Sequence, residues 1–183
     1  PFSGHGWFSH GFCHMNETMG HAIHDIRVFM DYLEDLGVPQ MGVTGISLGG
    51  YTSALLAAVD GRLRCAIPNV PVVSIMDIVL EWFPAGWFAR IGMKLGDISV
   101  TEARASVAIQ SALSFKPAIA KDRLMLIAGA GDRFAPPKHT HILWEHWQHC
   151  RLHWFPGNHL IHLDQGRYLH AMRSFLKHIK FVP

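Results

Sequence analysis

The chain has 183 residues, a formal net charge of +2, 49% hydrophobic residues and 16% charged residues. This length favours a single domain over residues 1–183 with a sizeable buried core, and the composition excludes a disordered acidic segment. The weak, evenly spread charge gives no reason to expect a nucleic-acid partner, and the most apolar stretch, 70–91, contains acids and prolines that argue against stable membrane insertion.

The first part of the chain predicts a loop followed by alternating helices and strands. Glycine, histidine and aromatic residues without periodicity predict a loop over 1–12. Apolar residues at helical spacing predict a helix over 19–36, which ends at a following glycine and proline. Short apolar runs at 41–46 and 63–69 predict buried strands, and the small apolar residues of 48–59 predict a buried helix between them.

The second part continues this alternation after one irregular segment. Residues 70–115 hold several helix-like pieces and four clustered aromatic residues. A strand is expected at 124–128, a helix at 138–150, a strand at 152–155 and a last helix that Asp164 caps. Short apolar strands alternating with helices predict an α/β protein with a mostly parallel sheet flanked by helices.

The strongest chemical signal is the sequence G-I-S-L-G-G at 45–50, which fits G-x-S-x-G between a predicted strand and a predicted helix. A serine on such a tight turn is exposed for nucleophilic attack, and residues two before and two after it must be small. Ser47 is therefore the candidate nucleophile, and the backbone N–H of Leu48 is the candidate oxyanion donor. A plain glycine-rich turn or a phosphate-binding loop would have a similar composition.

A nucleophilic serine needs a base, and the base needs an orienting acid. Asp132 follows the predicted strand 124–128 in the sequence G-A-G-D, which makes it the candidate acid. Glu145 and Asp164 are weaker alternatives, because one lies within a helix and the other lies beyond the candidate base. A purely structural role for Asp132 in capping the turn is the competing interpretation.

The base must be selected by position, because the chain has 14 histidines, five before Ile26 and nine after Lys138. His159 follows the last predicted strand in the sequence F-P-G-N-H. His153 lies within that strand and His162 lies further on. His159 is therefore the candidate base.

These segments resemble the α/β-hydrolase superfamily, whose catalytic residues occur in the order serine, acid, histidine. The sequence G-V-T-G-I-S-L-G-G-Y at 42–51 is similar to the branch with a G-x-T-G-x-S-x-G-G nucleophile elbow. The resemblance extends from Met19 onward. It implies that Ser47 is the nucleophile, Asp132 the acid and His159 the base, with no cofactor.

The chain departs from this pattern before the nucleophile. The family has several strands there, whereas residues 1–36 offer mostly one helix. His5 and Gly6 resemble the His-Gly oxyanion segments of some esterases, although the following connection differs. An exposed edge on the strand 41–46 would favour a homodimer or a further N-terminal portion.

The segment 70–115 lies where the family inserts a cap. Its aromatic residues are candidates for substrate binding through an apolar acyl pocket, although packing of the cap on the core is the alternative. These residues are Trp82, Phe83, Trp87 and Phe88. The late histidines, three of them at 139, 146 and 149, lack the spacing of a zinc motif, so no metal is expected.

The resulting hypothesis is a serine hydrolase that cleaves a small-molecule carboxylic ester through an acyl-enzyme. An amidase, thioesterase or acyltransferase would use the same three residues. The other class considered is an incomplete, non-catalytic domain that acts by binding. A dehalogenase would carry aspartate in place of Ser47. Three scattered cysteines without a C-x-x-C pair favour a reducing, cytoplasmic location.

Overall fold

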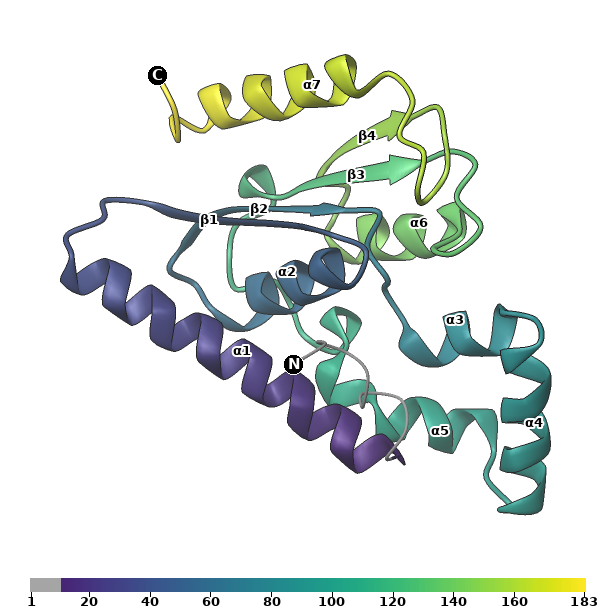
Figure 1. The fold of residues 1–183 in the computed structure, drawn as a ribbon. Helices are drawn as coiled ribbons and strands as arrows, with labels where there is room; N and C mark the ends of the chain where they lie inside the picture. Colours follow the sequence, from purple (N-terminus) through teal and green to yellow (C-terminus); the bar gives the residue numbers. More distant parts are fainter. Residues whose placement is uncertain (1–10) are drawn as a thin grey trace.

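The computed structural model describes residues 11–183 (Figure 1). Its sheet has four parallel strands in the order β1-β2-β3-β4, so that neighbours in the sheet are also consecutive in the chain. The strands are β1 (Met41–Ile46), β2 (Leu63–Asn69), β3 (Met125–Gly129) and β4 (Arg151–Phe155). The predicted parallel α/β arrangement is confirmed. Within the described residues β1 lies at one edge of the sheet, and its pairing with a second copy of the chain stays a prediction.

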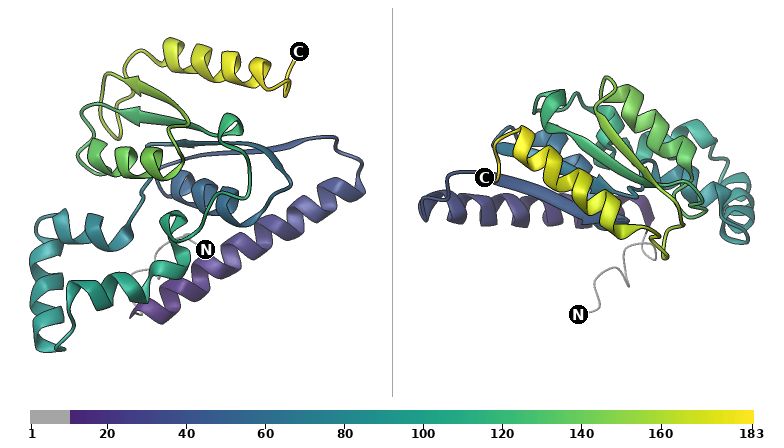
Figure 2. Two further views of the ribbon diagram at one scale, coloured as in Figure 1. Left: turned by 180° about the vertical axis from the view of Figure 1, so that it is seen from behind. Right: turned by 90° about the horizontal axis from the view of Figure 1, so that it is seen from above.

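Helices cover both faces of the sheet (Figures 1 and 2). One face packs against α1 (Gly11–Asp35), α2 (Leu48–Val59) and α6 (Pro137–His146), and the other packs against α7 (Gln165–His178). Because β3 is covered on both faces, all of its residues are buried and no apolar-polar alternation occurs. No helix within residues 11–183 is both long and apolar enough to cross a membrane.

An insertion of helices separates β2 from β3, where the sequence predicts a cap. It contains α3 (Ile75–Glu81), α4 (Ala85–Leu95) and α5 (Val100–Ser106), then the 3-10 turns η1 (Ala108–Gln110) and η2 (Ala112–Ser114); η3 (Lys121–Arg123) leads into β3. Ser99 and Glu102 form a capping box that starts α5. Both Figure 1 and the rear view in Figure 2 show α3, α4 and α5 outside the sheet, on the side toward which the strands point.

Some element boundaries differ from the sequence-based predictions. The helix α1 begins at Gly11, within the predicted loop 1–12, because Phe12 and Met15 pack against the core. The helix α6 ends at His146 rather than at 150, since Gln148 and His149 adopt a left-handed backbone. The side chain of Asp164 makes no cap hydrogen bond to α7. Packing and local backbone conformation account for these differences.

Strand register aligns the carboxyl ends of the strands. Ile46 pairs with Asn69, Asn69 pairs with Ile127, and Gly129 pairs with Phe155. The segments that follow β1, β3 and β4 therefore emerge at the same edge of the sheet. In open α/β sheets this edge is where ligands bind.

Candidate active site

Ser47 occupies a strained turn between β1 and α2. Its backbone has φ 57° and ψ −113°, a conformation that residues other than glycine seldom adopt. The turn is held by hydrogen bonds from Ser47 N–H to the Asn69 carbonyl at 3.0 Å and from Tyr51 N–H to the Ser47 carbonyl at 2.9 Å. A strained backbone of this kind persists only where its surroundings enforce it, and it is common at reactive residues.

The glycines around Ser47 are not equally constrained. A Cβ atom on Gly45 would lie 2.3 Å from the Gly49 carbonyl oxygen, and one on Gly50 would lie 2.8 Å from the Asn69 carbonyl oxygen. A Cβ atom on Gly49 would meet nothing within 4 Å among the described residues. Gly45 therefore has no room for a side chain, because strand and helix approach each other there. Gly49, two residues after Ser47, has that room.

The structure brings Ser47, His159 and Asp132 into one hydrogen-bonded line. The distance from His159 Nε2 to Ser47 Oγ is 2.7 Å, and that from His159 Nδ1 to Asp132 Oδ2 is also 2.7 Å. With the proton on Nδ1, the imidazole donates to Asp132 and accepts the hydroxyl proton of Ser47. The Asp132 and His159 side chains are 1% and 11% exposed, so water competes little for these bonds.

The Asp132 carboxylate is also held by the backbone. Its Oδ1 accepts hydrogen bonds from the N–H groups of Phe134 and Ala135, both at 2.8 Å. The other oxygen is thereby aimed at His159. This geometry combines the turn-capping role and the orienting role that the sequence left as alternatives.

The loops that carry the acid and the imidazole are joined by backbone hydrogen bonds. Ala130 N–H donates to the Phe155 carbonyl at 3.0 Å, and Gly131 N–H donates to the Gly157 carbonyl at 2.8 Å. A Cβ atom on Gly131 would lie 2.9 Å from that carbonyl oxygen. These backbone hydrogen bonds, together with the side-chain bond between Asp132 and His159, set the separation of the two loops.

One candidate oxyanion donor, the backbone N–H of Leu48, lies within the described residues. Leu48 is the first residue of α2, where backbone N–H groups have no partner within the helix and the helix dipole favours negative charge. Its predicted role is compatible with this position beside Ser47. His5 and Gly6, the predicted stand-in for a second donor, lie outside the described residues.

Two of the four predicted substrate-binding aromatics line a cavity together with Phe134, whose ring contacts His159. Trp82 Nε1 donates a hydrogen bond to the Phe134 carbonyl at 3.1 Å, and the two rings meet edge to face at 5.6 Å. The Phe134 ring lies 5.5 Å from the His159 ring, centre to centre. Trp82, Phe83 and Phe134 line a cavity of about 350 Å³, and its described lining includes no triad residue.

The structure does not bring the other two aromatics to this cavity. Trp87 and Phe88 are 56% and 61% exposed on α4, where their rings contact each other at 4.8 Å. Neither residue lines this cavity. The fold separates them from Trp82, because they follow in a different helix of the insertion.

Sequence reasoning missed three residues that line this cavity, namely Glu81, Arg133 and Phe134. The last two directly follow Asp132 in the sequence G-D-R-F, so their proximity to the site could have been inferred from that neighbourhood. The position of Glu81 could not be inferred in this way, because it depends on how the insertion folds back over the β3–α6 loop.

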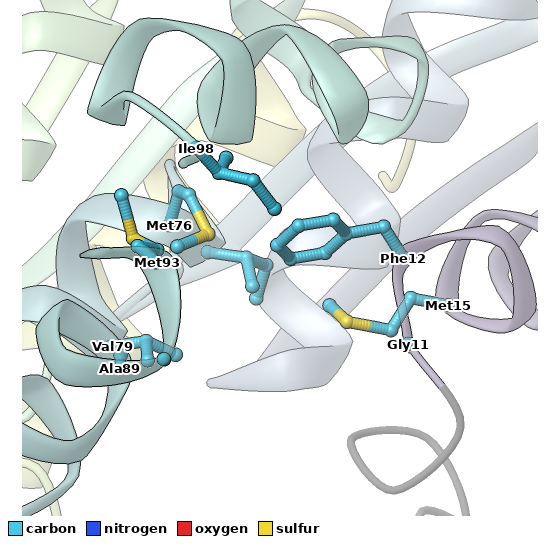
Figure 3. A pocket seen from close by; sticks show the side chains of 10 residues that line it. Gly11, Phe12, Met15, Met76, Val79, Ala89, Met93 and Ile98 are labelled. Carbon is cyan, nitrogen blue, oxygen red and sulfur yellow. The ribbon is translucent and has the colours of Figure 1, made fainter. Parts of the chain in front are cut away.

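A second cavity, of about 300 Å³, lies between the start of α1 and the insertion (Figure 3). Apolar side chains line it, among them Phe12, Met15, Met76 and Met93, and none of its ten lining residues belongs to the triad. Within residues 11–183, no three histidine, cysteine or acidic side chains gather as a metal site would require.

Comparisons of the sequence reveal similar proteins. A model described as the prolyl oligopeptidase family matches residues 2–180. Two curated relatives, both uncharacterized proteins from strains of Mycobacterium tuberculosis, are 29% identical over 143 residues. The match covers 75% of this chain and 33% of each relative, so the chain spans about a third of the length of these relatives.

Solved structures share the fold. Est1E from Butyrivibrio proteoclasticus superposes with a TM-score of 0.65 and 18% identity, covering 90% of this chain and 71% of its own. A puromycin hydrolase gives 0.63 and 18%, covering 85% of this chain and 24% of its own. An esterase from Pyrococcus furiosus gives 0.58 and 18%, covering 85% and 61%. The predicted α/β-hydrolase fold is confirmed by these similarities.

Proposed function

The chain belongs to the prolyl oligopeptidase family of α/β-hydrolase serine hydrolases, and from that premise we propose that it cleaves carboxylic esters through an acyl-enzyme. The observation that carries the proposal is the hydrogen-bonded line from Asp132 through His159 to Ser47, with both distances at 2.7 Å. Acyl transfer by a serine nucleophile, a base and an orienting acid requires an arrangement of this kind, which supports the proposal.

In the proposed reaction, Ser47 Oγ attacks the ester carbonyl carbon while its proton passes to His159 Nε2. The negative charge that develops on the carbonyl oxygen is stabilised at the start of α2, where the Leu48 N–H donates. Collapse of this intermediate releases the alcohol, which takes the proton from His159. Asp132 stabilises the imidazolium and keeps the ring in its productive orientation.

Hydrolysis then releases the acyl group, with water as the nucleophile and Ser47 Oγ as the leaving group. His159 removes a proton from a water molecule, which attacks the acyl carbon attached to Ser47. The tetrahedral intermediate collapses to the carboxylic acid, and Ser47 Oγ regains its proton from His159. These steps use side chains and backbone groups of this chain, so the proposal includes no cofactor.

Amide hydrolysis is the second candidate, because the family is described by a peptidase and one similar structure is a puromycin hydrolase. We favour esters because the similarity to the Pyrococcus furiosus esterase extends over 61% of that protein, against 24% of the puromycin hydrolase. An ester also has a better leaving group than an amide, so its hydrolysis needs less oxyanion stabilisation than the Leu48 N–H and a second donor would provide together.

Matched substrates distinguish the two candidates. We expect 4-nitrophenyl acetate to be hydrolysed with a far higher kcat/KM than 4-nitroacetanilide, which has the same acyl group. The Ser47→Ala variant should hydrolyse neither. Cleavage of the anilide as fast as the ester would make the protein an amidase and overturn the preference for esters.

The non-catalytic alternative is tested by covalent labelling. A fluorophosphonate should add once to the parent protein and not to the Ser47→Ala variant, as measured by intact mass. A folded parent that gains no adduct and turns over no ester would establish a binding domain in place of an enzyme.

A further inference from the structure

The cavity lined by Trp82, Phe83 and Phe134 contains one charged group without a partner in the described part of the chain. Arg133 lines this cavity and is exposed, and it takes part in none of the ion pairs found within residues 11–183. Its neighbour along the chain is the catalytic candidate Asp132, whose carboxylate is fully engaged by His159 and two backbone N–H groups. The guanidinium is therefore available to a ligand.

The other charged residue of the cavity is already neutralised. Glu81 Oε1 lies 2.9 Å from Lys138 Nζ, and Glu81 Oε2 lies 3.4 Å from His139 Nε2. Burial alone would raise the pKa of Glu81, but Lys138 and His139 outweigh it and the pKa is lowered overall. The carboxylate is therefore ionised and paired, which leaves Arg133 as the uncompensated charge of the cavity.

The position of the cavity indicates which part of a substrate would occupy it. His159 donates its proton to the departing group in the proposed reaction, so that group lies beside the imidazole. The Phe134 ring contacts that imidazole and also forms a wall of the cavity, together with Trp82 and Phe83. A departing group that extends from the imidazole past the Phe134 ring would therefore enter a cavity with aromatic walls that Arg133 also lines.

We propose that Arg133 is a specificity-determining residue that selects substrates whose leaving group is aromatic or apolar and carries an anion such as a carboxylate. A guanidinium matches the planar geometry of a carboxylate and can donate two parallel hydrogen bonds to it. The place of this contact in the reaction rests on the proposed function, whereas the binding of the anion does not.

Binding is tested first without turnover, in the Ser47→Ala protein. The probes are 4-hydroxybenzoate and its neutral analogue 4-hydroxybenzamide, and their dissociation constants are measured by ligand-observed NMR titration. Because Arg133 is exposed and the contact is screened, we expect the benzoate to bind only about fivefold more tightly. Adding Arg133→Gln should abolish this preference.

The matched control is Arg90→Gln in the same Ser47→Ala background. Arg90 is an exposed arginine on α4 that does not line the cavity, so its loss removes the same charge and should keep the preference. Equal binding of the two probes to the Ser47→Ala protein would overturn the proposal. A preference that survives Arg133→Gln would overturn it as well.

Turnover then tests the role in selection. The ratio of kcat/KM for 4-acetoxybenzoate to that for 4-acetoxybenzamide should fall about fivefold in Arg133→Gln relative to the parent, and further in Arg133→Glu. An unchanged ratio in active variants overturns the selectivity proposal alone. An Arg133-dependent binding preference without turnover of either ester supports anion binding at this residue and overturns the esterase function alone.

Discussion

The two ends of α2 differ in their local energetics, because the first carries backbone strain and the second carries stabilising ion pairs. At its start, Ser47 has a left-handed backbone and makes no side-chain cap, and the preceding strand approaches so closely that Gly45 has no room for a Cβ atom. Strain of this kind costs about 1–3 kcal/mol, and the proposed role of Ser47 as the nucleophile accounts for its presence. Under that proposal, the start of the helix favours reactivity at the expense of stability.

At the C-terminal end of α2, ion pairs connect the helix with α1. Asp60, whose side chain is 3% exposed, accepts from Arg27 at 3.0 Å and from Arg62 at 2.7 Å. Arg62 also pairs with Asp31 and Glu34 of α1. The hydrogen bond from Arg62, opposed by burial, lowers the pKa of Asp60 to about 2. A carboxylate at a helix C-terminus is unfavourable to the helix dipole, so its arginine partners are what make this position stabilising.

We therefore expect activity and stability to respond separately to substitutions along α2. Substitutions at the start of α2 and in the loops facing it should lower activity more than stability. Substitutions at the end of α2 should lower stability and leave the reaction intact. Unchanged activity in Asp132→Asn or Gly45→Ala, or a loss of activity in Asp60→Asn, would contradict this comparison.

The largest effect is expected for Asp132→Asn. An asparagine keeps the shape but favours the wrong tautomer of His159, so kcat for an ester should fall about 10⁴-fold. Circular dichroism and the midpoint of thermal unfolding should show that the fold is retained. A loss of less than tenfold in kcat would contradict the role of Asp132 as the orienting acid.

The next largest effect concerns the glycines that flank Ser47. Gly45→Ala should lower the free energy of unfolding by about 1–3 kcal/mol and abolish fluorophosphonate labelling, since its Cβ would overlap backbone. Gly49→Ala is the matched control and should leave both nearly unchanged, because its Cβ meets open space. Urea unfolding and labelling rates measure the pair, and equal effects at the two positions would contradict the described turn.

At the other end of the helix, Asp60→Asn should lower the free energy of unfolding by about 2 kcal/mol at pH 7. The kcat of an ester should stay within about twofold of the parent, since the position is remote from the reaction. Urea unfolding and ester kinetics on the same preparation test both statements.

The pH dependence of that stability follows from the sign of the shift. The folded pKa of Asp60, about 2, lies below the unfolded value. Its contribution is therefore complete above about pH 3.9 and is lost as the pH falls toward 2. The parent should lose stability more steeply than Asp60→Asn across this window, and parallel curves would show that Asp60 does not provide the linkage.

The smallest effect is expected in the insertion. Trp82→Phe removes the hydrogen bond to the Phe134 carbonyl and should raise KM for an aryl ester about threefold, with kcat little changed. Trp87→Phe on α4 is the control and should change neither constant. If both variants raise KM equally, the exposed face of α4 takes part in substrate binding.

Several features were predictable from the sequence because they depend on local chemistry. Glycines on both sides of Ser47, an apolar run before it and small apolar residues after it predict a strand, a tight turn and a buried helix. Strands followed by G-D and by G-N-H predict loops at the carboxyl edge of a parallel sheet. The sheet and the elbow follow from these local patterns, as does the choice of Asp132 and His159 as candidates.

Other features depend on contacts between distant segments. Nothing in the sequence near Trp82 shows that its indole meets the Phe134 carbonyl, or that Trp87 faces solvent instead. The start of α1 at Gly11 depends on packing of Phe12 and Met15 against residues far along the chain. Aromatic residues and helix ends carry weak local preferences, so the tertiary environment decides them.

Local patterns in the sequence predict a candidate nucleophile, acid and base, because each needs a particular residue type at a particular point of a strand and turn. The two hydrogen bonds of 2.7 Å that join Ser47, His159 and Asp132 depend on the tertiary structure instead. The same holds for Arg133, which forms no ion pair within the described residues, and for Glu81, which does. Pairing and distance arise from how parallel strands align and how the insertion folds over them, which no local pattern specifies.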